Sequence, residues 1–272
     1  MTFFSLQAGI PPVSLPKAPE CHRQMSSERD GKRFLIPPSR RLTWDLLWFH
    51  KAVPLCAHDR RMALAETAAC RLAARRRISW PALFLKAAGL AAVEFPELRQ
   101  TWFRWPSAHL YQHPHTVAVI TVQREIEGEP WLFWGRIPQP EQLTLADIQE
   151  RIEQFQQDDP KRVFRQALQL AKLPLLLRRA VWWWNLNVNP RDRARRLGTC
   201  FLSTLAGRGV EIQLPPSVHT ACFTYGPLDE QGRCRVTLAY DHRIMDGARV
   251  AAILECMEKL LTGTLLQELR DH

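Results

Sequence analysis

The chain has 272 residues, of which 46% are hydrophobic, and a formal net charge of +10 at pH 7. This length and composition allow a sizeable core and exclude a disordered or fibrous chain. The seven cysteines are scattered and form no C-x-x-C pair, so we expect neither a disulfide framework nor a cysteine zinc site. This cysteine usage favours a location in the reducing cytoplasm. The sequence contains no uncharged run of about 18 apolar residues, so we expect no transmembrane helix.

The positive charge would suit nucleic acid, an anionic membrane surface or a phosphate-bearing cofactor, or it could be only a solvated basic surface. No helix-turn-helix, zinc-finger or aromatic RNA-binding motif accompanies it. We therefore expect no nucleic-acid partner.

Residues 1–34 are predicted to be a flexible arm, because four prolines between residues 11 and 19 and a polar stretch at 26–32 argue against a packed element. The remainder, residues 35–272, is predicted to be one folded domain.

Helices are expected at 60–77, with an alanine-rich and a basic face, and at 80–94, where Ser79 stands at the N-cap position. Residues 117–122 and 131–137 read as strands. A helix over 144–154 begins with Thr144 and Asp147 spaced as in a capping box.

Residues 162–189 are rich in leucine and arginine and end in Trp182-Trp183-Trp184. These tryptophans could pack in the core or at a subunit contact, wall an acyl-chain pocket, or lie against a membrane surface. Pro190 is expected to begin a basic loop over 191–196.

Strands are expected at 199–202, 221–225 and 235–240, with a hairpin turn at 229–232 between the last two. An amphipathic helix over 248–261 closes the chain. Helices followed by strands with long connections predict an α+β layered domain.

The junction between the last strand and the last helix collects Asp241, His242, Arg243 and Asp246 within six positions. A histidine has an unperturbed pKa of about 6.5, so at a strand end it is suited to take a proton near neutral pH. Taken alone, His242 could equally be a surface residue, and Asp246 with Gly247 only a helix cap.

The segment Asp241-His242-Arg243-Ile244-Met245-Asp246-Gly247 resembles the D-H-R-x-x-D-G motif of the dihydrolipoamide acyltransferases of 2-oxoacid dehydrogenase complexes. Their shorter H-x-x-x-D-G pattern is shared with chloramphenicol acetyltransferases. Residues 198–206 are similar to the family's G-T-F-T-x-S-N-x-G strand, with Thr204 and Ala206 in place of its asparagine and glycine. The resemblance covers roughly residues 35–265 and implies a chloramphenicol-acetyltransferase-like two-layer fold, a mixed sheet packed by helices.

The resemblance further implies an acyltransferase with His242 as general base, Ser203 as oxyanion donor and Asp246 as the organising carboxylate, paired with an arginine such as Arg40 or Arg41. The acyl donor would be a thioester of coenzyme A or a carrier protein, and the acceptor a thiol, hydroxyl or amine. No metal and no covalently bound lipoyl group are expected. A homotrimer with active sites shared between chains is implied, and peripheral membrane contact is possible.

Two alternatives remain at this point. The chain could be a catalytically idle trimeric scaffold or binding subunit, or the acyltransferase component of a 2-oxoacid dehydrogenase complex served by a separate lipoyl protein. Elsewhere, His109, His113 and His115 have partial zinc-ligand spacing, but Pro114 breaks a helix there and we expect an ordinary loop. His219 is expected to be structural.

Overall fold

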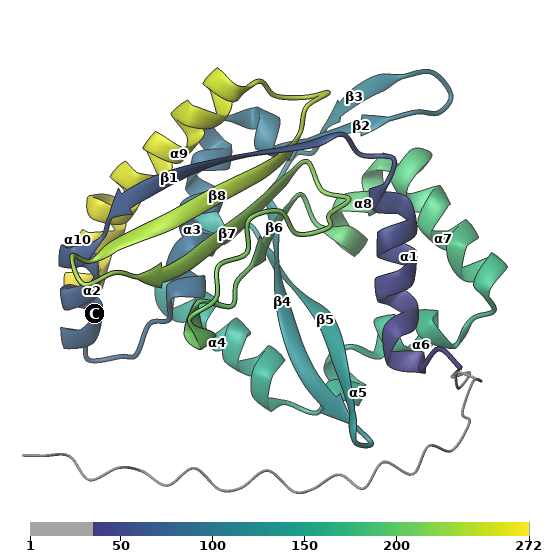
Figure 1. Cartoon of the computed structure of the whole chain (residues 1–272), viewed down its shortest axis with the longest axis horizontal. Helices are drawn as coiled ribbons and strands as arrows, with labels where there is room; N and C mark the ends of the chain where they lie inside the picture. The colour runs from purple at the N-terminus through teal and green to yellow at the C-terminus, as the bar shows by residue number, and fades with distance from the viewer. Residues whose placement is uncertain (1–34, 272) are drawn as a thin grey trace, which may run out of the picture. The chain divides into compact units, whose positions relative to one another are not determined.

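A six-stranded mixed sheet organises the chain, as the computed structural model shows for residues 35–271 (Figure 1). The strand order is β1-β8-β7-β6-β4-β5. Strand β6 runs parallel to β4 and β7, and the other neighbouring pairs are antiparallel. The predicted arm over 1–34 lies outside the described residues.

The strands of the sheet and of a separate hairpin, β2-β3, are β1 (Leu55–Ala63), β2 (Gln100–Phe103), β3 (His109–Gln112), β4 (Val117–Ile126), β5 (Glu129–Pro138), β6 (Cys200–Ser203), β7 (Ala221–Leu228) and β8 (Arg233–Asp241). The α-helices are α1 (Arg41–His50), α2 (Ala65–Ala73), α3 (Trp80–Glu94), α4 (Leu145–Gln157), α5 (Pro160–Val163), α6 (Arg165–Lys172), α7 (Leu175–Asn187), α8 (Pro190–Leu197), α9 (Gly247–Thr262) and α10 (Thr264–Arg270).

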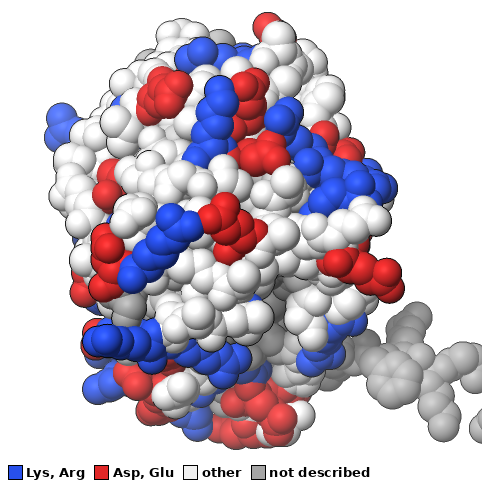
Figure 2. Space-filling view, turned by 90° about the vertical axis from the view of Figure 1, so that its left-hand side faces the viewer, with Lys and Arg blue, Asp and Glu red and all other residues white. Residues whose placement is uncertain are grey.

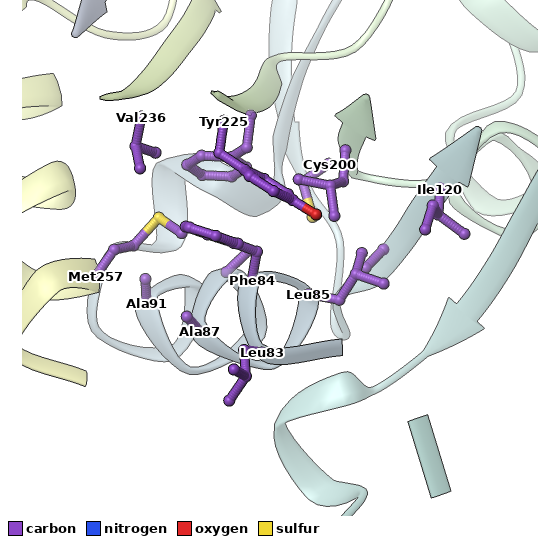
Figure 3. Close-up of a cluster of buried hydrophobic side chains, with 14 of the residues drawn as sticks. Leu83, Phe84, Leu85, Ala87, Ala91, Ile120, Cys200, Tyr225, Val236 and Met257 are labelled. Carbon is purple, nitrogen blue, oxygen red and sulfur yellow. The ribbon is translucent and has the colours of Figure 1, made fainter. Parts of the chain in front are cut away.

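The main core lies between one face of the sheet and helix α3, which is buried almost all round (Figure 3). Phe84 of α3 stacks on Tyr225 of β7 with ring centroids 4.3 Å apart. Met257 of α9 and Val236 of β8 extend the same cluster. Burying such side chains contributes roughly 1.5–3 kcal/mol each, so this layer holds the sheet rigid.

The opposite face of the sheet is covered differently. Val119, Phe201, Cys222 and Ala239 form a smaller cluster there, against which Trp134 packs. The connection after β6 passes over this face, because the Thr224 hydroxyl donates to the carbonyl oxygen of Ile212 at 2.6 Å.

Helices α1 and α7 pack together beside the β5 edge of the sheet (Figure 1). Asp45 of α1, fully buried, accepts from the guanidinium of Arg178 on α7. Leu46 and Trp182 complete the contact. A buried ion pair therefore joins these two helices.

The predicted α+β architecture with a mixed sheet and helix layer is confirmed. Helix 80–94 is confirmed at both ends, and the capping box of α4 forms, with the Thr144 side chain accepting from the Asp147 N–H. Ser79 stands at the N-cap of α3, but its hydroxyl makes no capping hydrogen bond.

The predictions for residues 60–77 and 191–196 are wrong. Residues 60–63 of the expected helix 60–77 belong to β1 instead, because β1 pairs along its whole length with β8, and the helix spans only Ala65–Ala73. The expected basic loop at 191–196 is helix α8. Pro190 occupies its first turn, where proline is favoured, and Asn189 caps it by accepting from the Asp192 N–H.

Candidate functional site

His242 lies in the turn between strand β8 and helix α9. Strand β8 ends at Asp241, and α9 begins at Gly247 with Asp246 as its N-cap residue. The His242 N–H donates to the carbonyl oxygen of Pro54 at 3.1 Å, which ties the turn to the start of β1. The imidazole itself is 46% exposed, so a substrate can reach it.

The carboxylate of Asp246 stands beside that imidazole, with Oδ1 3.6 Å from Nδ1 of His242. This places the carboxylate on one ring nitrogen and leaves Nε2 facing away from it. At 3.6 Å the two groups make no hydrogen bond, and Asp246 is 88% exposed, so within one chain the carboxylate lies beside the ring without fixing it.

Aromatic rings complete the surroundings of His242. The Tyr240 ring lies 5.6 Å from it, and His58 of β1 stacks on Tyr240 from 5.5 Å. A Cβ at Gly247 would approach the His58 ring to 3.3 Å, so this glycine keeps the helix start close to β1.

The residues flanking His242 hold the turn in place, a contribution the motif alone did not reveal. Asp241 is buried, and it accepts from Arg243 at 2.6 Å (Nη2) and 2.8 Å (Nε). The Arg243 guanidinium also lies 4.1 Å above the ring of Trp102. A planar guanidinium suits both contacts, so Arg243 links the turn that carries His242 to the β2-β3 hairpin.

Ser203 ends strand β6 and is half-buried. Its Oγ accepts from the Thr121 hydroxyl at 3.4 Å. Thr204, where the resembling family has asparagine, donates to the carbonyl oxygen of Tyr225 at 2.9 Å and accepts from the Ala206 N–H at 3.0 Å. The threonine thus fixes the turn that follows Ser203.

The start of this strand requires its glycine. Gly198 has a φ of +91°, and a Cβ there would meet the Val119 side chain at 2.1 Å. Thr199 then anchors the strand, because its hydroxyl accepts from the Val117 N–H at 3.0 Å. The G-T pair of the motif therefore sets the path of β6 toward Ser203.

Ser203 and His242 do not meet within one chain. Ser203 is in register with Thr224 and, through it, with Thr237 of β8. His242 lies five residues further along β8, and strands β6 and β8 run in opposite directions. At about 3.3 Å per residue and about 4.8 Å per strand, the two residues are on the order of 15–20 Å apart.

The arginine suggested for Asp246 is not beside it in this chain either. Arg41 donates to the carbonyl oxygen of Ala171, on the α1–α6 side of the molecule. Its pairing with Asp246 stays a prediction that only contact between two copies could fulfil.

The remaining histidines have structural surroundings. His109 lies on β3 and His113 directly after it, so this stretch is a hairpin strand rather than the expected loop. Burial, with help from Arg193, lowers the pKa of His113 to about 4. His219 is buried between the Ser217 hydroxyl and the carbonyl oxygen of Leu197, and burial lowers its pKa to about 4. Both are neutral at pH 7.

The tryptophan run divides by burial. Trp182 is in the core, whereas Trp183 and Trp184 are 43% and 53% exposed. Within residues 35–271, no helix has the length and apolar character needed to span a membrane. In the same range, no three His, Cys, Asp or Glu side chains gather in a metal-binding arrangement.

No protein-family model matches the chain, and no curated protein matches its sequence. Solved structures do match. A probable dihydrolipoamide acetyltransferase from Listeria monocytogenes is 15% identical, with a TM-score of 0.62 over 85% of this chain and 94% of that one. The truncated catalytic core of a 2-oxoacid dehydrogenase complex from Thermoplasma acidophilum is 14% identical, with a TM-score of 0.63 over 86% and 99%.

A third structure, of the dihydrolipoamide acetyltransferase of Azotobacter vinelandii, is 15% identical, with a TM-score of 0.63 over 96% of this chain and all of that one. That structure concerns one serine, one histidine and one asparagine in the catalytic mechanism of that enzyme. At these identities the comparison establishes the fold, and the chain has the fold of dihydrolipoamide acetyltransferase catalytic cores.

Proposed function

We propose that this chain is an acyltransferase that moves an acyl group from a thioester donor to a thiol, hydroxyl or amine, with His242 as its general base. One observation carries the proposal: an exposed imidazole, with the Asp246 carboxylate 3.6 Å away, stands at a strand–helix junction. The shared fold supports it. In the Azotobacter protein the asparagine named with the catalytic histidine follows it by four positions, the spacing of Asp246 from His242.

The reaction needs few groups. Nε2 of His242 removes the proton of the acceptor as the acceptor attacks the thioester carbonyl carbon. The resulting oxyanion accepts a hydrogen bond from the Ser203 hydroxyl. The carbon–sulfur bond then breaks, and the departing thiolate takes the proton back from His242, so that the enzyme returns to its starting state.

A second copy of the chain would complete the site. His242 and Ser203 lie on oppositely directed strands and are too far apart within one chain to act on one carbonyl. We propose a homotrimer in which His242 of one chain faces Ser203 of the next.

Complementation tests this arrangement. His242→Ala and Ser203→Ala proteins are each expected to be nearly inactive, whereas unfolding and refolding them together should restore part of the activity in mixed assemblies. Light scattering should show a trimer or a multiple of it. An active monomer, or no recovery from a mixture that demonstrably exchanges subunits, would contradict the shared site.

The donor is proposed to be a thioester of coenzyme A or of a carrier protein, and the acceptor is proposed not to be a lipoyl domain. A panel of acyl-CoAs, assayed by release of free thiol, would identify the donor. Offering free dihydrolipoamide, a lipoylated domain and simple alcohols or amines would identify the acceptor. Efficient transfer to the lipoylated domain alone would place the chain in a dehydrogenase complex, and no transfer from any donor would favour an idle scaffold.

A further inference from the structure

A cavity of about 1370 Å³ lies between α1, β5 and the helices α5–α8, away from the proposed reaction site. Neither His242 nor Ser203 lines it. Pockets for drug-sized ligands measure roughly 300–1,000 Å³, so this cavity has room for a molecule with a long chain. We call it the arginine cavity.

One part of the arginine cavity is apolar. It is lined by side chains from four elements, among them Leu46, Trp134, Phe164, Leu170 and Trp182. Trp134 and Leu170 are partly exposed, whereas Leu46, Phe164 and Trp182 are buried, so a hydrocarbon chain would gain free energy mainly by covering the first two, at about 25 cal/mol per Å² buried.

The other part is strongly basic. Among residues 35–271, seven arginines and no aspartate or glutamate line the cavity. In the described part of the chain, Arg151, Arg165 and Arg191 form no ion pair with an acidic side chain. Arginines without counter-charges around one cavity repel one another, and a bound anion would remove that repulsion.

Arg136 brings the charge to the cavity wall itself. Its guanidinium donates to the carbonyl oxygens of Arg195 and Arg196 at 3.3 and 2.9 Å, and burial together with the charge of Arg195 lowers its pKa. The segment 160–197, which forms most of this side, carries ten arginines and lysines against the single acid Asp192.

Two buried polar atoms on the cavity-lining residues also have no partner. Nε1 of Trp182 and Oδ1 of Asn185 make no hydrogen bond within residues 35–271. Buried tryptophan N–H groups usually find an acceptor. Both atoms are closed off from solvent, so they are not part of the binding surface of the cavity.

We propose that the arginine cavity binds an amphiphile with one long apolar chain and a phosphate or carboxylate head. The chain covers Leu132, Trp134 and Leu170, and the head lies among the arginines. The site is independent of the proposed acyl transfer, because binding requires neither His242 nor Ser203.

Calorimetry on the whole protein tests the proposal with four soluble probes. Dodecyl phosphate, kept below its micelle concentration, carries both parts; dodecyl maltoside carries the chain alone; inorganic phosphate and coenzyme A carry phosphate without the chain. Dodecyl phosphate is expected to bind at least about tenfold more tightly than the other three. Equally tight binding of coenzyme A or of phosphate would overturn the proposal.

A vesicle arm separates the cavity from surface attraction. If phosphatidic acid vesicles bind the protein while monomeric dodecyl phosphate does not, the basic side is a membrane-contact surface and the cavity proposal fails. If the monomer binds at one site per chain, the cavity is supported.

Variants place the head and the chain. Arg165→Gln with Arg191→Gln, both exposed and unpaired with acids in the described chain, should weaken dodecyl phosphate about tenfold or more. Arg75→Gln with Arg77→Gln, an equal change of charge in the α2–α3 connection, should leave it within about twofold. Equal losses in the two pairs would overturn the proposal.

Leu132→Glu changes the chain-binding part. Leu132 lines the cavity, yet it is 44% exposed, so the fold tolerates the change. The alkyl chain would have to cover the new carboxylate, which should weaken dodecyl phosphate by about tenfold, whereas His242→Ala should not alter its affinity. Unchanged binding in Leu132→Glu would place the ligand elsewhere.

Discussion

On the side formed by α2, α9 and α10, basic and acidic side chains meet in pairs: Arg60 with Glu258, Lys259 with Glu255, and Arg270 with Glu66 (Figure 2). On the side formed by α5–α8, residues 160–197 hold a formal charge of +9, although Lys161, Arg162, Arg178 and Arg179 pair with acids outside this segment. The first side includes α9, the helix that follows His242, and the second encloses the arginine cavity.

This difference shows that the net charge is not a uniform solvated surface. Charge is balanced where the molecule supports the strand–helix junction, and it is concentrated where a cavity of about 1370 Å³ can accept an anion. The two sides therefore suggest two tasks, with chemistry at the β8–α9 junction and recognition at the arginine cavity.

The largest expected effect separates these tasks. His242→Ala should lower turnover by about 10²–10⁴-fold, because a positioned base supplies that much. Its thermal stability should be nearly unchanged, since the side chain is 46% exposed. His109→Ala, a histidine on β3, is the matched control and should keep full turnover. Near wild-type turnover in His242→Ala would remove the proposed mechanism.

The second effect concerns the joint between α1 and α7 on the basic side. Asp45→Ala leaves Arg178 buried without its counter-charge, which should cost about 3–5 kcal/mol in the free energy of unfolding. Urea unfolding would measure it. The double change Asp45→Leu with Arg178→Met should recover most of the loss, and a single-variant loss below about 1 kcal/mol would show that the pair is not isolated from water.

The third effect depends on pH. His219 is neutral when folded, with its pKa lowered to about 4, whereas an unfolded histidine titrates near 6.5. The unfolded chain therefore binds more protons between these values, so stability is complete above about pH 6.5 and falls by up to about 3 kcal/mol as the pH drops to 4.

His219→Gln should flatten this acid-side slope. His113, whose pKa is lowered in the same direction, should account for a similar share, and His113→Gln provides the comparison. Unfolding curves at pH 4, 5, 6 and 7 measure both. Parallel pH profiles in wild type and His219→Gln would mean that His219 is charged inside the fold.

The sequence predicted elements where local pattern and packing agree. Helix α3 has an apolar sequence on nearly every side and lies in the core, and the Thr144–Asp147 capping box marks α4 directly. It failed where pairing with a distant strand decides the outcome. Residues 60–63 have a helical pattern, yet they form β1 because β8 offers them a complete ladder of hydrogen bonds.

The candidate site shows the same division. A short motif indicated His242, Asp246 and Ser203, but the support of the turn is long-range. The contact between Arg243 and Trp102 joins residues 141 positions apart, and no local pattern records it. The arginine cavity is also assembled from distant elements, α1, β5 and α5–α8. The sequence pattern therefore shows its arginines only as scattered basic residues, some of them in the expected loop at 191–196.

The smallest expected effect tests whether charge balance matters for stability on the paired side. Glu258 accepts from Arg60 at 2.5 Å and from the Ala63 N–H at 2.9 Å, and its side chain is 18% exposed against 44% for Arg60. Glu258→Gln keeps an acceptor for the backbone but removes the charge. Because a partly exposed ion pair is screened by water and salt, the loss should stay below about 1 kcal/mol and shrink further in 1 M salt. A salt-independent loss of several kcal/mol would instead show that the pairs on this side hold β1 against α9, and that the balance of charge there is structural as well as electrostatic.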